Sequence, residues 1–342
     1  MDDTNATIQK FVTPTPSRAE YWRAIVLFGR NVASYKFALA KSLLDLRSRS
    51  GELIYLEELA VPFARHICEH LGDAGKQTTS PTSRFLDSCL GFNRGEVTHD
   101  ALIDTTVRLG FNNVIDAFHN VNQLDVPLRF FTDARKRGAI QLTDDLIVMS
   151  STISAPDLSA EVEARWRLVE RAWELRISRN VVGVGYDEEL QMLVAPRAGR
   201  RVAITSCRDA LNGYQNGKCF YCERLISLTE SSTMAEVDHF FPHCLAAMSP
   251  AFTSTVNGVW NLVLACGPCN RGAGGKFSRV PALPLLTLLH RRNEYLIASH
   301  HPLRETILAQ TGTTEQMRRG FLQARYSIAH TLLIQAWSPI AL

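Results

Sequence analysis

Four cysteines of this chain are spaced as metal ligands. Cys219 and Cys222 form one Cys-x-x-Cys pair, and Cys266 and Cys269 form a second pair after an interval of 43 residues. A Cys-x-x-Cys turn lets two sulfur atoms reach one ion, and two such turns complete the tetrahedron of thiolates that Zn²⁺ prefers. The interval is longer than a minimal zinc ribbon requires. The spacing therefore predicts a structural zinc site whose connecting segment carries other residues.

Two other interpretations of these cysteines are weaker. Unligated thiols are often buried in a core, but two independent x-x spacings would then be a coincidence. Disulfides are disfavoured because the sequence shows no apolar N-terminal signal segment and intracellular thiols stay reduced, so we expect a cytoplasmic protein. We interpret the remaining cysteines as small buried apolar residues: Cys68, Cys89, Cys207 and Cys244.

The segment between the cysteine pairs carries acid–base and metal-binding residue types. Residues 236–242 and 261–265 contain strand-forming residues, and residues 269–271 have the pattern of the start of a short helix. Asp238 and His239 lie in the first of these strands. Because adjacent strand residues point to opposite faces, both could serve one centre only at a bulge or a strand end.

The ordered set of these residues resembles the HNH, or ββα-metal, nuclease family. The resemblance covers residues 219–276 and is specific as an order of motifs. It is carried by the two cysteine pairs, Asp238-His239 with Pro242, Asn261-Leu262 and Cys269-Asn270. It implies two strands and a helix held together by zinc, around a second, catalytic metal.

The resemblance also implies a role for each matching position. His239 would be the general base that activates water, and Asp238 and Asn270 would hold one divalent ion. Asn261 would hydrogen-bond the loop that carries the base. Imidazole has the unperturbed pKa that suits water activation near neutral pH. Sparse protein ligation suits Mg²⁺, with Mn²⁺ as a substitute.

The sequence departs from the family pattern at two points. The last letter of the motif is Asn270 rather than histidine, and the run 272–275 separates Asn270 from Lys276 by more residues than usual. Glycine is poor in a helix interior, so we expect a short finger helix. Arg271 and Lys276 are the candidate nucleic-acid contacts, with Arg271 the alternative to Lys276. The family assigns no role to the position of His243.

The basic excess of the chain lies with this motif. The formal net charge of the 342 residues is +3, but residues 201–342 carry +5 and residues 1–200 carry −2. A polyanionic substrate favours such an excess. The composition, 46% hydrophobic and 21% charged, is that of a globular protein. Since no apolar run approaches the ~20 residues of a membrane helix, we expect no membrane partner.

Most of the remaining chain has the periodicity of helices. We expect a long amphipathic helix from Ser17 to Gly51, capped by Ser17 and Glu20. Further helices are expected at 53–71, 98–121, 159–180, 283–299 and 313–332, and short strands at 128–131, 147–149, 192–194 and 202–204.

The predicted fold class is mainly α with a small α+β insertion. Helical N-terminal and C-terminal regions would surround a zinc-bound ββα-metal HNH module. The expected domains are residues 1–200, residues 203–281 for the nuclease module, and residues 282–342, whose helices would pack on the N-terminal helical body.

The expected function is metal-dependent hydrolysis of phosphodiester bonds in DNA. One centre cuts one strand, so a double-strand break would need a dimer or two sequential nicks. An HNH module beside a large helical region resembles nuclease components of bacterial anti-phage defence and restriction systems. Residues 1–200 would then recognise a partner protein or DNA and restrain the nuclease.

Two alternatives to a DNA nuclease stay open. RNA is an alternative substrate, because the phosphate is common to both nucleic acids. The alternative from another class is a zinc-stabilised nucleic-acid-binding or scaffold module without cleavage. Asp238, His239 and Asn270 argue against that alternative, because a scaffold needs none of them.

Overall fold

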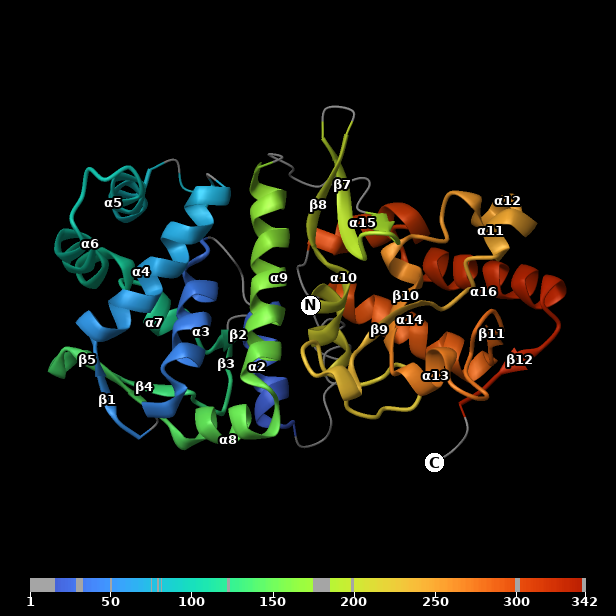
Figure 1. The fold of residues 1–342 in the computed structure, drawn as a ribbon, viewed down its shortest axis with the longest axis horizontal. Helices are drawn as coiled ribbons and strands as arrows, with labels where there is room; N and C mark the ends of the chain where they lie inside the picture. The colour runs from blue at the N-terminus through green and yellow to red at the C-terminus, as the bar shows by residue number, and fades with distance from the viewer. Residues whose placement is uncertain are drawn as a thin grey trace. The chain divides into compact units, whose positions relative to one another are not determined.

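The computed structural model divides into two compact units, Pro14–Ile177 and a second unit that contains Ser178–Leu342 (Figure 1). The structure describes residues 16–28, 33–49, 51–74, 76–78, 80, 82–121, 124–174, 185–197, 200–298 and 302–339. Among these residues, no helix combines the length and the apolar character that crossing a membrane would require. Both units are mainly helical with small sheets, as the sequence predicts.

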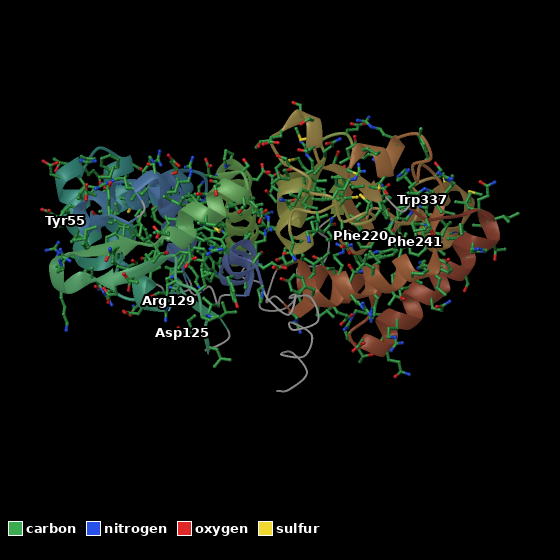
Figure 2. All side chains as sticks on the ribbon, turned by 90° about the horizontal axis from the view of Figure 1, so that it is seen from below. Tyr55, Asp125, Arg129, Phe220, Phe241 and Trp337 are labelled. Atoms are coloured by element: carbon green, nitrogen blue, oxygen red, sulfur yellow. The ribbon has the colours of Figure 1, made fainter. Side chains whose placement is uncertain are left out.

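The first unit is built from helices and two small sheets. Its helices are α2 (Arg18–Phe28), α3 (Tyr35–Asp45), α4 (Leu56–Asp73), α5 (Arg84–Asn93), α6 (His99–Thr105), α7 (Val114–Ala117), α8 (Asp144–Thr152) and α9 (Ala155–Glu174). Strands β1 (Leu53–Tyr55), β5 (Ala139–Leu142) and β4 (Phe131–Ala134) form an antiparallel sheet in that order, and β2 (Asn120–Val121) pairs with β3 (Leu124–Asp125). The ion pair between Asp125 and Arg129 lies at this second pair of strands (Figure 2).

Two strand predictions in this unit are wrong. Residues 147–149, predicted as a strand from their β-branched residues, lie in α8. Asp144 and Asp145 occupy the first turn of α8, where the helix dipole favours carboxylates. The structure has no strand over residues 128–130, and β4 begins only at Phe131.

The helix predictions in this unit differ from the structure in their bounds, and the helix predicted at 159–180 begins four residues earlier, at Ala155. The helix predicted from Ser17 to Gly51 is present as α2 and α3, with residues 29–32 outside the described part of the chain. Residues 53–55 are strand β1 before α4. The predicted helix 98–121 consists of α6, a π-helical turn over Thr106–Gly110, α7 and β2.

Helix α9 supplies the buried stripe that its spacing predicts. Val162, Trp166 and Val169, spaced three or four residues apart, are buried on one face of the helix. The Trp166 ring stacks on His70 of α4, with 3.4 Å between the ring centroids. Trp166 also packs against Phe37 of α3. Helix α9 therefore joins α3 and α4 around one core.

The buried stripe of α9 carries a polar network as well. His70 hydrogen-bonds Glu170 at 2.6 Å and Glu163 at 3.1 Å, and both carboxylates come from α9. Gln77 donates to Glu170 and accepts a hydrogen bond from the Trp166 indole. Burial by itself would lower the pKa of His70, but the two carboxylates outweigh burial and raise it.

The second unit contains the cysteine pairs and the C-terminal helices. Its strands are β6 (Gly185–Asp187), β7 (Met192–Arg197), β8 (Arg200–Ser206), β9 (Glu236–His239), β10 (Leu262–Ala265), β11 (Val280–Pro281) and β12 (Ala336–Trp337). Its helices are α10 (Cys207–Asn212), α11 (Leu245–Met248), α12 (Pro250–Thr253), α13 (Gly267–Arg271), α14 (Leu283–Ala298), α15 (Pro302–Thr311) and α16 (Glu315–Leu332). The sheets are β6–β7–β8, β9–β10 and the parallel pair β11–β12.

The strand–strand–helix order expected over residues 236–271 is present. Strands β9 and β10 form the hairpin, and α13 follows as the short finger helix. The predicted strands 192–194 and 202–204 lie in β7 and β8, and the predicted helices 283–299 and 313–332 correspond to α14 and α16. Helix α15 is a further element that was not predicted.

The C-terminal helices pack on the hairpin of their own unit. Arg292 and Asn293 of α14 donate hydrogen bonds to the backbone carbonyl of Trp260, directly before β10. Phe321 of α16 lies edge-on to the Trp260 ring at 4.9 Å. Phe220, Phe241 and Trp337 belong to the buried aromatic core of this unit (Figure 2). Packing of these helices on the first unit stays a prediction.

Candidate functional site

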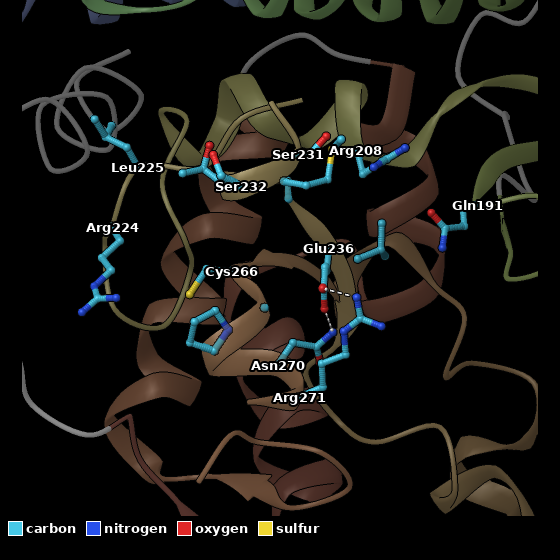
Figure 3. Close-up of a pocket in the computed structure, with 16 residues that line it drawn as sticks. Gln191, Arg208, Arg224, Leu225, Ser231, Ser232, Glu236, Cys266, Asn270 and Arg271 are labelled. Carbon is cyan, nitrogen blue, oxygen red and sulfur yellow. Dashed lines mark hydrogen bonds and ion pairs between the residues drawn. The ribbon is translucent and has the colours of Figure 1, made fainter. Parts of the chain in front are cut away.

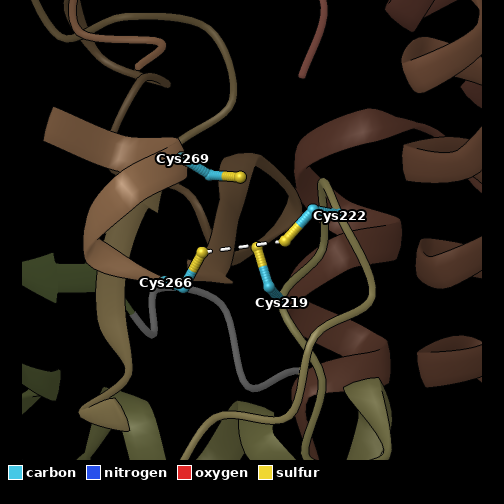
Figure 4. A group of neighbouring side chains, drawn as sticks. All are labelled: Cys219, Cys222, Cys266 and Cys269. Carbon is cyan, nitrogen blue, oxygen red and sulfur yellow. Dashed lines mark hydrogen bonds between the residues drawn. The ribbon is translucent and has the colours of Figure 1, made fainter. Parts of the chain in front are cut away.

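The two cysteine pairs come together as one cluster of four sulfurs (Figure 4). The sulfur atoms of Cys219, Cys222, Cys266 and Cys269 all lie within 4.8 Å of one another, and those of Cys222 and Cys266 are 3.7 Å apart. Four thiolates at about 2.3 Å from zinc have sulfurs about 3.8 Å apart, so the cluster fits a structural zinc ion. Within the described residues it is the only group of three or more histidines, cysteines or acids with metal-binding spacing.

The other cysteines lie apart from this cluster. Cys68, Cys89 and Cys207 are buried, as expected for small apolar residues. Cys244 is exposed, so the prediction that it is buried is wrong. It lies directly before the short helix α11, where Leu245 faces the core in its place.

Backbone hydrogen bonds fasten the first cysteine pair to the hairpin. The Phe220 amide donates to the carbonyl of Leu264 in β10, and the Cys219 amide donates to the carbonyl of Arg224. Glu223 adopts a left-handed backbone conformation, with φ of 61°, which closes the turn around the pair. Since β10 leads directly into Cys266, these contacts bring the two pairs together.

Asp238 and His239 point to opposite faces of the hairpin. Strand β9 pairs with β10 in a regular antiparallel register, in which Asp238 is opposite Val263 and His239 is opposite Leu262. Successive side chains of a regular strand alternate between faces. Asp238 therefore shares its face with Glu236, whereas His239 faces the other side.

Asp238 has a buried hydrogen-bond partner on each of its two oxygens. The Tyr221 hydroxyl donates to one oxygen at 2.6 Å, and the Lys276 ammonium lies 3.1 Å from the other. The Lys276 side chain is fully buried. Burial lowers the pKa of Lys276, and Asp238 offsets part of that effect. The structure thus gives no support for Lys276 as a phosphate contact.

The glycine run after Asn270 explains how Lys276 reaches Asp238. The chain folds back on α13, so that the Lys276 amide donates to the carbonyl of Cys269 at 2.7 Å. A Cβ atom at Gly272 would lie 2.6 Å from Cα of Pro268, and Gly274 has a φ of 75°. Only glycine allows this close return of the backbone.

Asn270 and Arg271 both contact Glu236 rather than Asp238. The Asn270 amide donates to one Glu236 oxygen at 2.8 Å, and the Arg271 guanidinium lies 2.7 Å from the other. The finger helix is therefore tied to the start of β9. Asp238 and Asn270 are not hydrogen-bonded to one another, and as arranged they do not fit a shared divalent ion.

His239 is held by a side chain that the sequence did not suggest. Its Nε2 lies 2.8 Å from Oδ1 of Asn257, so that the ring donates to the amide oxygen and keeps a lone pair on Nδ1. The Tyr186 amide donates to the Asn257 backbone carbonyl, and the Tyr186 ring lies edge-on to His239. Burial lowers the pKa of His239, and Asn257 offsets part of that effect. His239 is therefore a neutral base near pH 7.

Asn261 clamps the segment that follows His239. Its Oδ1 accepts from the Phe241 amide at 2.8 Å, and its Nδ2 donates to the carbonyls of Phe241 and Val256. Asn261 is fully buried, so these bonds satisfy its whole amide group. These hydrogen bonds fix the direction of the backbone where the chain leaves β9.

The sequence reasoning missed Tyr221, Asn257 and Glu236. Tyr221 lies between two cysteines, and nothing in that spacing indicates a partner for its hydroxyl. Asn257 precedes Gly258, and an Asn-Gly dipeptide is a turn signal that does not reveal a side-chain partner. Glu236 precedes Asp238 by two residues, and this period-2 spacing is the one signal that could have placed both on one face.

Comparison with known proteins identified no relative of this chain. A scan against protein-family models, a search of curated proteins and a search of solved structures found no match for this chain. The resemblance to HNH nucleases therefore depends on the order of motifs within residues 219–276.

Proposed function

We propose that this protein is an HNH-type endonuclease that hydrolyses phosphodiester bonds of DNA, with His239 as the general base. The observation that supports this proposal most is the setting of His239. Its Nε2 is hydrogen-bonded to Asn257, burial lowers its pKa, and its ring lies on the strand that the zinc cluster holds in place. A neutral imidazole with one free nitrogen suits the activation of water.

The proposed reaction is a displacement at phosphorus. Nδ1 of His239 takes a proton from water, and the water oxygen forms a bond to phosphorus. The bond from phosphorus to the leaving oxygen breaks, and that oxygen takes a proton from solvent. A divalent ion would stabilise charge on the phosphate. Because Asp238 and Asn270 do not fit such an ion as they are arranged, we assign no step to it.

The four-cysteine cluster and the charge distribution support the same proposal. The four-cysteine cluster holds the hairpin that carries His239, and residues 201–342 carry the basic excess that a polyanion favours. We place the enzyme in bacterial anti-phage defence, with the first unit recognising a protein partner or DNA. That placement follows from the resemblance in domain organisation alone.

The test of the proposal is cleavage of supercoiled plasmid. Purified protein is incubated with Mg²⁺, with Mn²⁺ and without added divalent ions, beside His239→Ala. The exposed neighbour His243, whose ring lies 5.4 Å from that of His239, provides the matched control His243→Ala. We expect nicking by the wild type and by His243→Ala, and a loss of at least about 100-fold in His239→Ala. Equal cleavage by His239→Ala would remove His239 from the mechanism.

One observation favours a second candidate, a zinc-stabilised nucleic-acid-binding module without cleavage. Asp238 is neutralised by the buried Lys276, and Asn270 is held by Glu236, which is an arrangement that a scaffold can use. Single-stranded RNA and DNA substrates added to the same assay separate the candidates. Binding without cleavage of either nucleic acid in any metal would favour the binding module, and cleavage of RNA alone would make the enzyme an RNase.

A further inference from the structure

A pocket of about 510 Å³ lies beside the zinc cluster in the second unit (Figure 3). Five segments line it: Gln191, the start of α10, the turn after the first cysteine pair, residues 231–237 from the 3-10 helix Ser231–Thr233 to the start of β9, and Cys266 with α13. Its volume falls in the range of about 300–1,000 Å³ that ligand sites occupy. Cys266, Asn270 and Arg271, which have roles implied by the resemblance, line one part of the pocket, and the rest of its lining has no assigned role.

Arginines dominate the charge of the pocket. Arg208 comes from α10, Arg224 from the turn after Cys222, and Arg271 from α13. Glu236 is the one acidic side chain in the lining, and both of its oxygens are engaged, one by Arg271 and one by Asn270. Arg208 and Arg224 are therefore not paired with a carboxylate of the lining, and the remaining negative charge at the wall is that of the Cys266 thiolate in the four-cysteine cluster.

Of the three arginines that line the pocket, Arg208 and Arg224 are not paired with another described residue. Within the described part of the chain, neither guanidinium forms an ion pair or a hydrogen bond with another residue. Arg208 is half-buried and Arg224 is exposed. A half-buried guanidinium keeps donors that favour an anionic partner, and the guanidinium fork matches the oxygens of a phosphate. Ser231 and Ser232 add exposed hydroxyl donors at the rim.

The pocket lies in line with His239 along strand β9. Glu236 and Val237 at the start of β9 line the pocket, and His239 ends the same strand. Three residue steps of a strand span about 10 Å. His239 therefore lies on the same short hairpin as the pocket, although its side chain points to the face of β9 opposite that of Glu236.

We propose that the arginine pocket, defined by Arg208, Arg224 and Arg271, binds backbone phosphates of a nucleic acid strand. Arg208 and Arg224 contact the phosphates directly, and Arg271 contributes charge while it holds Glu236. The choice of a nucleic acid as the ligand rests on the proposed function. The pocket positions a strand and takes no part in the bond-breaking step.

The test is binding of fluorescein-labelled single-stranded and double-stranded oligonucleotides, followed by anisotropy without added divalent ions. The variants are Arg208→Gln, Arg224→Gln and the double variant. Arg319→Gln is the matched control, because Arg319 is exposed on α16 and does not line the pocket. We expect the double variant to bind the oligonucleotides at least about 10-fold more weakly than the wild type. The slope of the logarithm of the binding constant against the logarithm of the salt concentration should fall by about one unit per arginine, and Arg319→Gln should bind like the wild type.

Folding and the source of the phosphate are checked in the same series. Zinc content and thermal melting show whether each variant is folded, and the exposed Arg224 gives an informative single variant if Arg208→Gln fails to fold. Inorganic phosphate and a nucleoside triphosphate are added as competitors. Displacement of the oligonucleotide only at millimolar concentrations of either is the expected result. Binding of the triphosphate alone, with no oligonucleotide bound, would overturn the proposal.

The outcomes separate this inference from the proposed function. Unchanged affinity and salt slope in the double variant would refute the arginine pocket and leave cleavage by His239 untouched. Weaker binding in the double variant, together with no cleavage by the wild type, would uphold the pocket and refute the nuclease.

Discussion

The role of Asp238 depends on which cation its carboxylate contacts. The Lys276 ammonium lies 3.1 Å from one Asp238 oxygen and is fully buried, while Tyr221 donates to the other oxygen. A buried charge whose partner is removed is costly, whereas a buried pair adds little to stability over an apolar substitute. Asp238 is therefore a structural carboxylate in this arrangement, and a divalent ion at this position would have to compete with Lys276.

Removing Asp238 is expected to destabilise the second unit strongly. Asp238→Ala leaves the Lys276 ammonium buried without a partner, so we expect the free energy of unfolding to fall by about 3–5 kcal/mol. The double variant Asp238→Ala, Lys276→Met should recover part of that loss, because no charge is left buried. Urea denaturation followed by circular dichroism measures both. If the double variant is less stable than the single variant, the pair does not interact as described.

Asn257 is expected to act through His239. Asn257→Ala removes the acceptor that fixes the ring, so we expect cleavage to slow by about 10–100-fold with zinc content and melting temperature unchanged. Asn257→Asp keeps an acceptor for Nε2 and should retain more activity than the alanine variant. Plasmid-nicking rates under single-turnover conditions measure the effect. Equal rates for Asn257→Ala and the wild type would rule out a positioning role.

At the scale of elements, the return of the chain after α13 determines where Lys276 lies. A side chain at Gly272 would meet the backbone of Pro268, and one at Gly275 would meet the carbonyls of Gly272 and Pro268. Backbone atoms at these positions cannot move aside for a new Cβ atom as the end of a flexible side chain can. The glycine run that departs from the family spacing is therefore the feature that lets the chain reach back to β9.

A methyl group at Gly272 is expected to disturb this return. Gly272→Ala should lower the free energy of unfolding by about 1–3 kcal/mol, because the new Cβ lies 2.6 Å from Cα of Pro268. A Cβ atom added at Gly320 in α16 would meet no atom within 4 Å, so Gly320→Ala is the matched control and should stabilise by about 0.5–1 kcal/mol. Thermal denaturation of both variants tests the difference, and similar melting temperatures would contradict it.

The His70 network predicts how the stability of the first unit depends on pH. The raised pKa of His70 means that the folded state holds this proton more tightly, so His70 stabilises below about pH 6.5 and the gain is lost as pH rises through its folded pKa. The pKa of Glu163 is lowered despite burial, so its contribution is present above about pH 4.3 and lost as pH falls. The network therefore stabilises most between these two values.

The test compares the wild type with His70→Gln at pH 6 and pH 9. We expect the difference in the free energy of unfolding between the two proteins to be larger at pH 6. Burial lowers the pKa of His119 to about 3, which works in the opposite direction below about pH 6.5, but His119 is present in both proteins and cancels in the difference. Lys41 and Arg167 also pair with Glu163, and both are present in the wild type and in the variant. A pH-independent difference would contradict the network.

At the scale of the whole molecule, the two units have separate sources of stability. The first unit has a continuous apolar core that includes Phe37, Phe63 and Trp166. The second unit contains the four-cysteine cluster, and structural zinc sites contribute directly to the free energy of folding. The two units should therefore respond differently to loss of the metal.

Removal of zinc is expected to unfold the second unit selectively. A thiol-reactive mercurial with a chelator should release one zinc per chain and raise hydrogen exchange across 203–281, while Pro14–Ile177 stays protected. Cys222→Ser should reproduce this result, and Cys244→Ser, which changes an exposed cysteine outside the cluster, should not. Mass spectrometry of the exchanged peptides measures it. Equal loss of protection in both units would contradict separate stability.

The sequence by itself determined the cysteine cluster, the hairpin and the short helix after it. A Cys-x-x-Cys spacing and a strand pattern are properties of a few neighbouring residues, so the local sequence is enough to predict the structures that they form. The mainly helical class also followed from local periodicity. The strand predicted at 147–149 failed because Asp144 and Asp145 favour the start of a helix there, which local β-branched composition does not reveal.

Only the tertiary structure decided what the candidate site residues contact. Asp238 meets Lys276, 38 residues later, and Asn270 meets Glu236, 34 residues earlier. The arginine pocket likewise gathers Arg208, Arg224 and Arg271 from separate segments. Which side chains become partners depends on which distant segments the fold brings together. The sequence around one residue does not identify a partner that lies far away in the chain. The sequence therefore points to the chemistry available, and the folded chain assigns each group its neighbour.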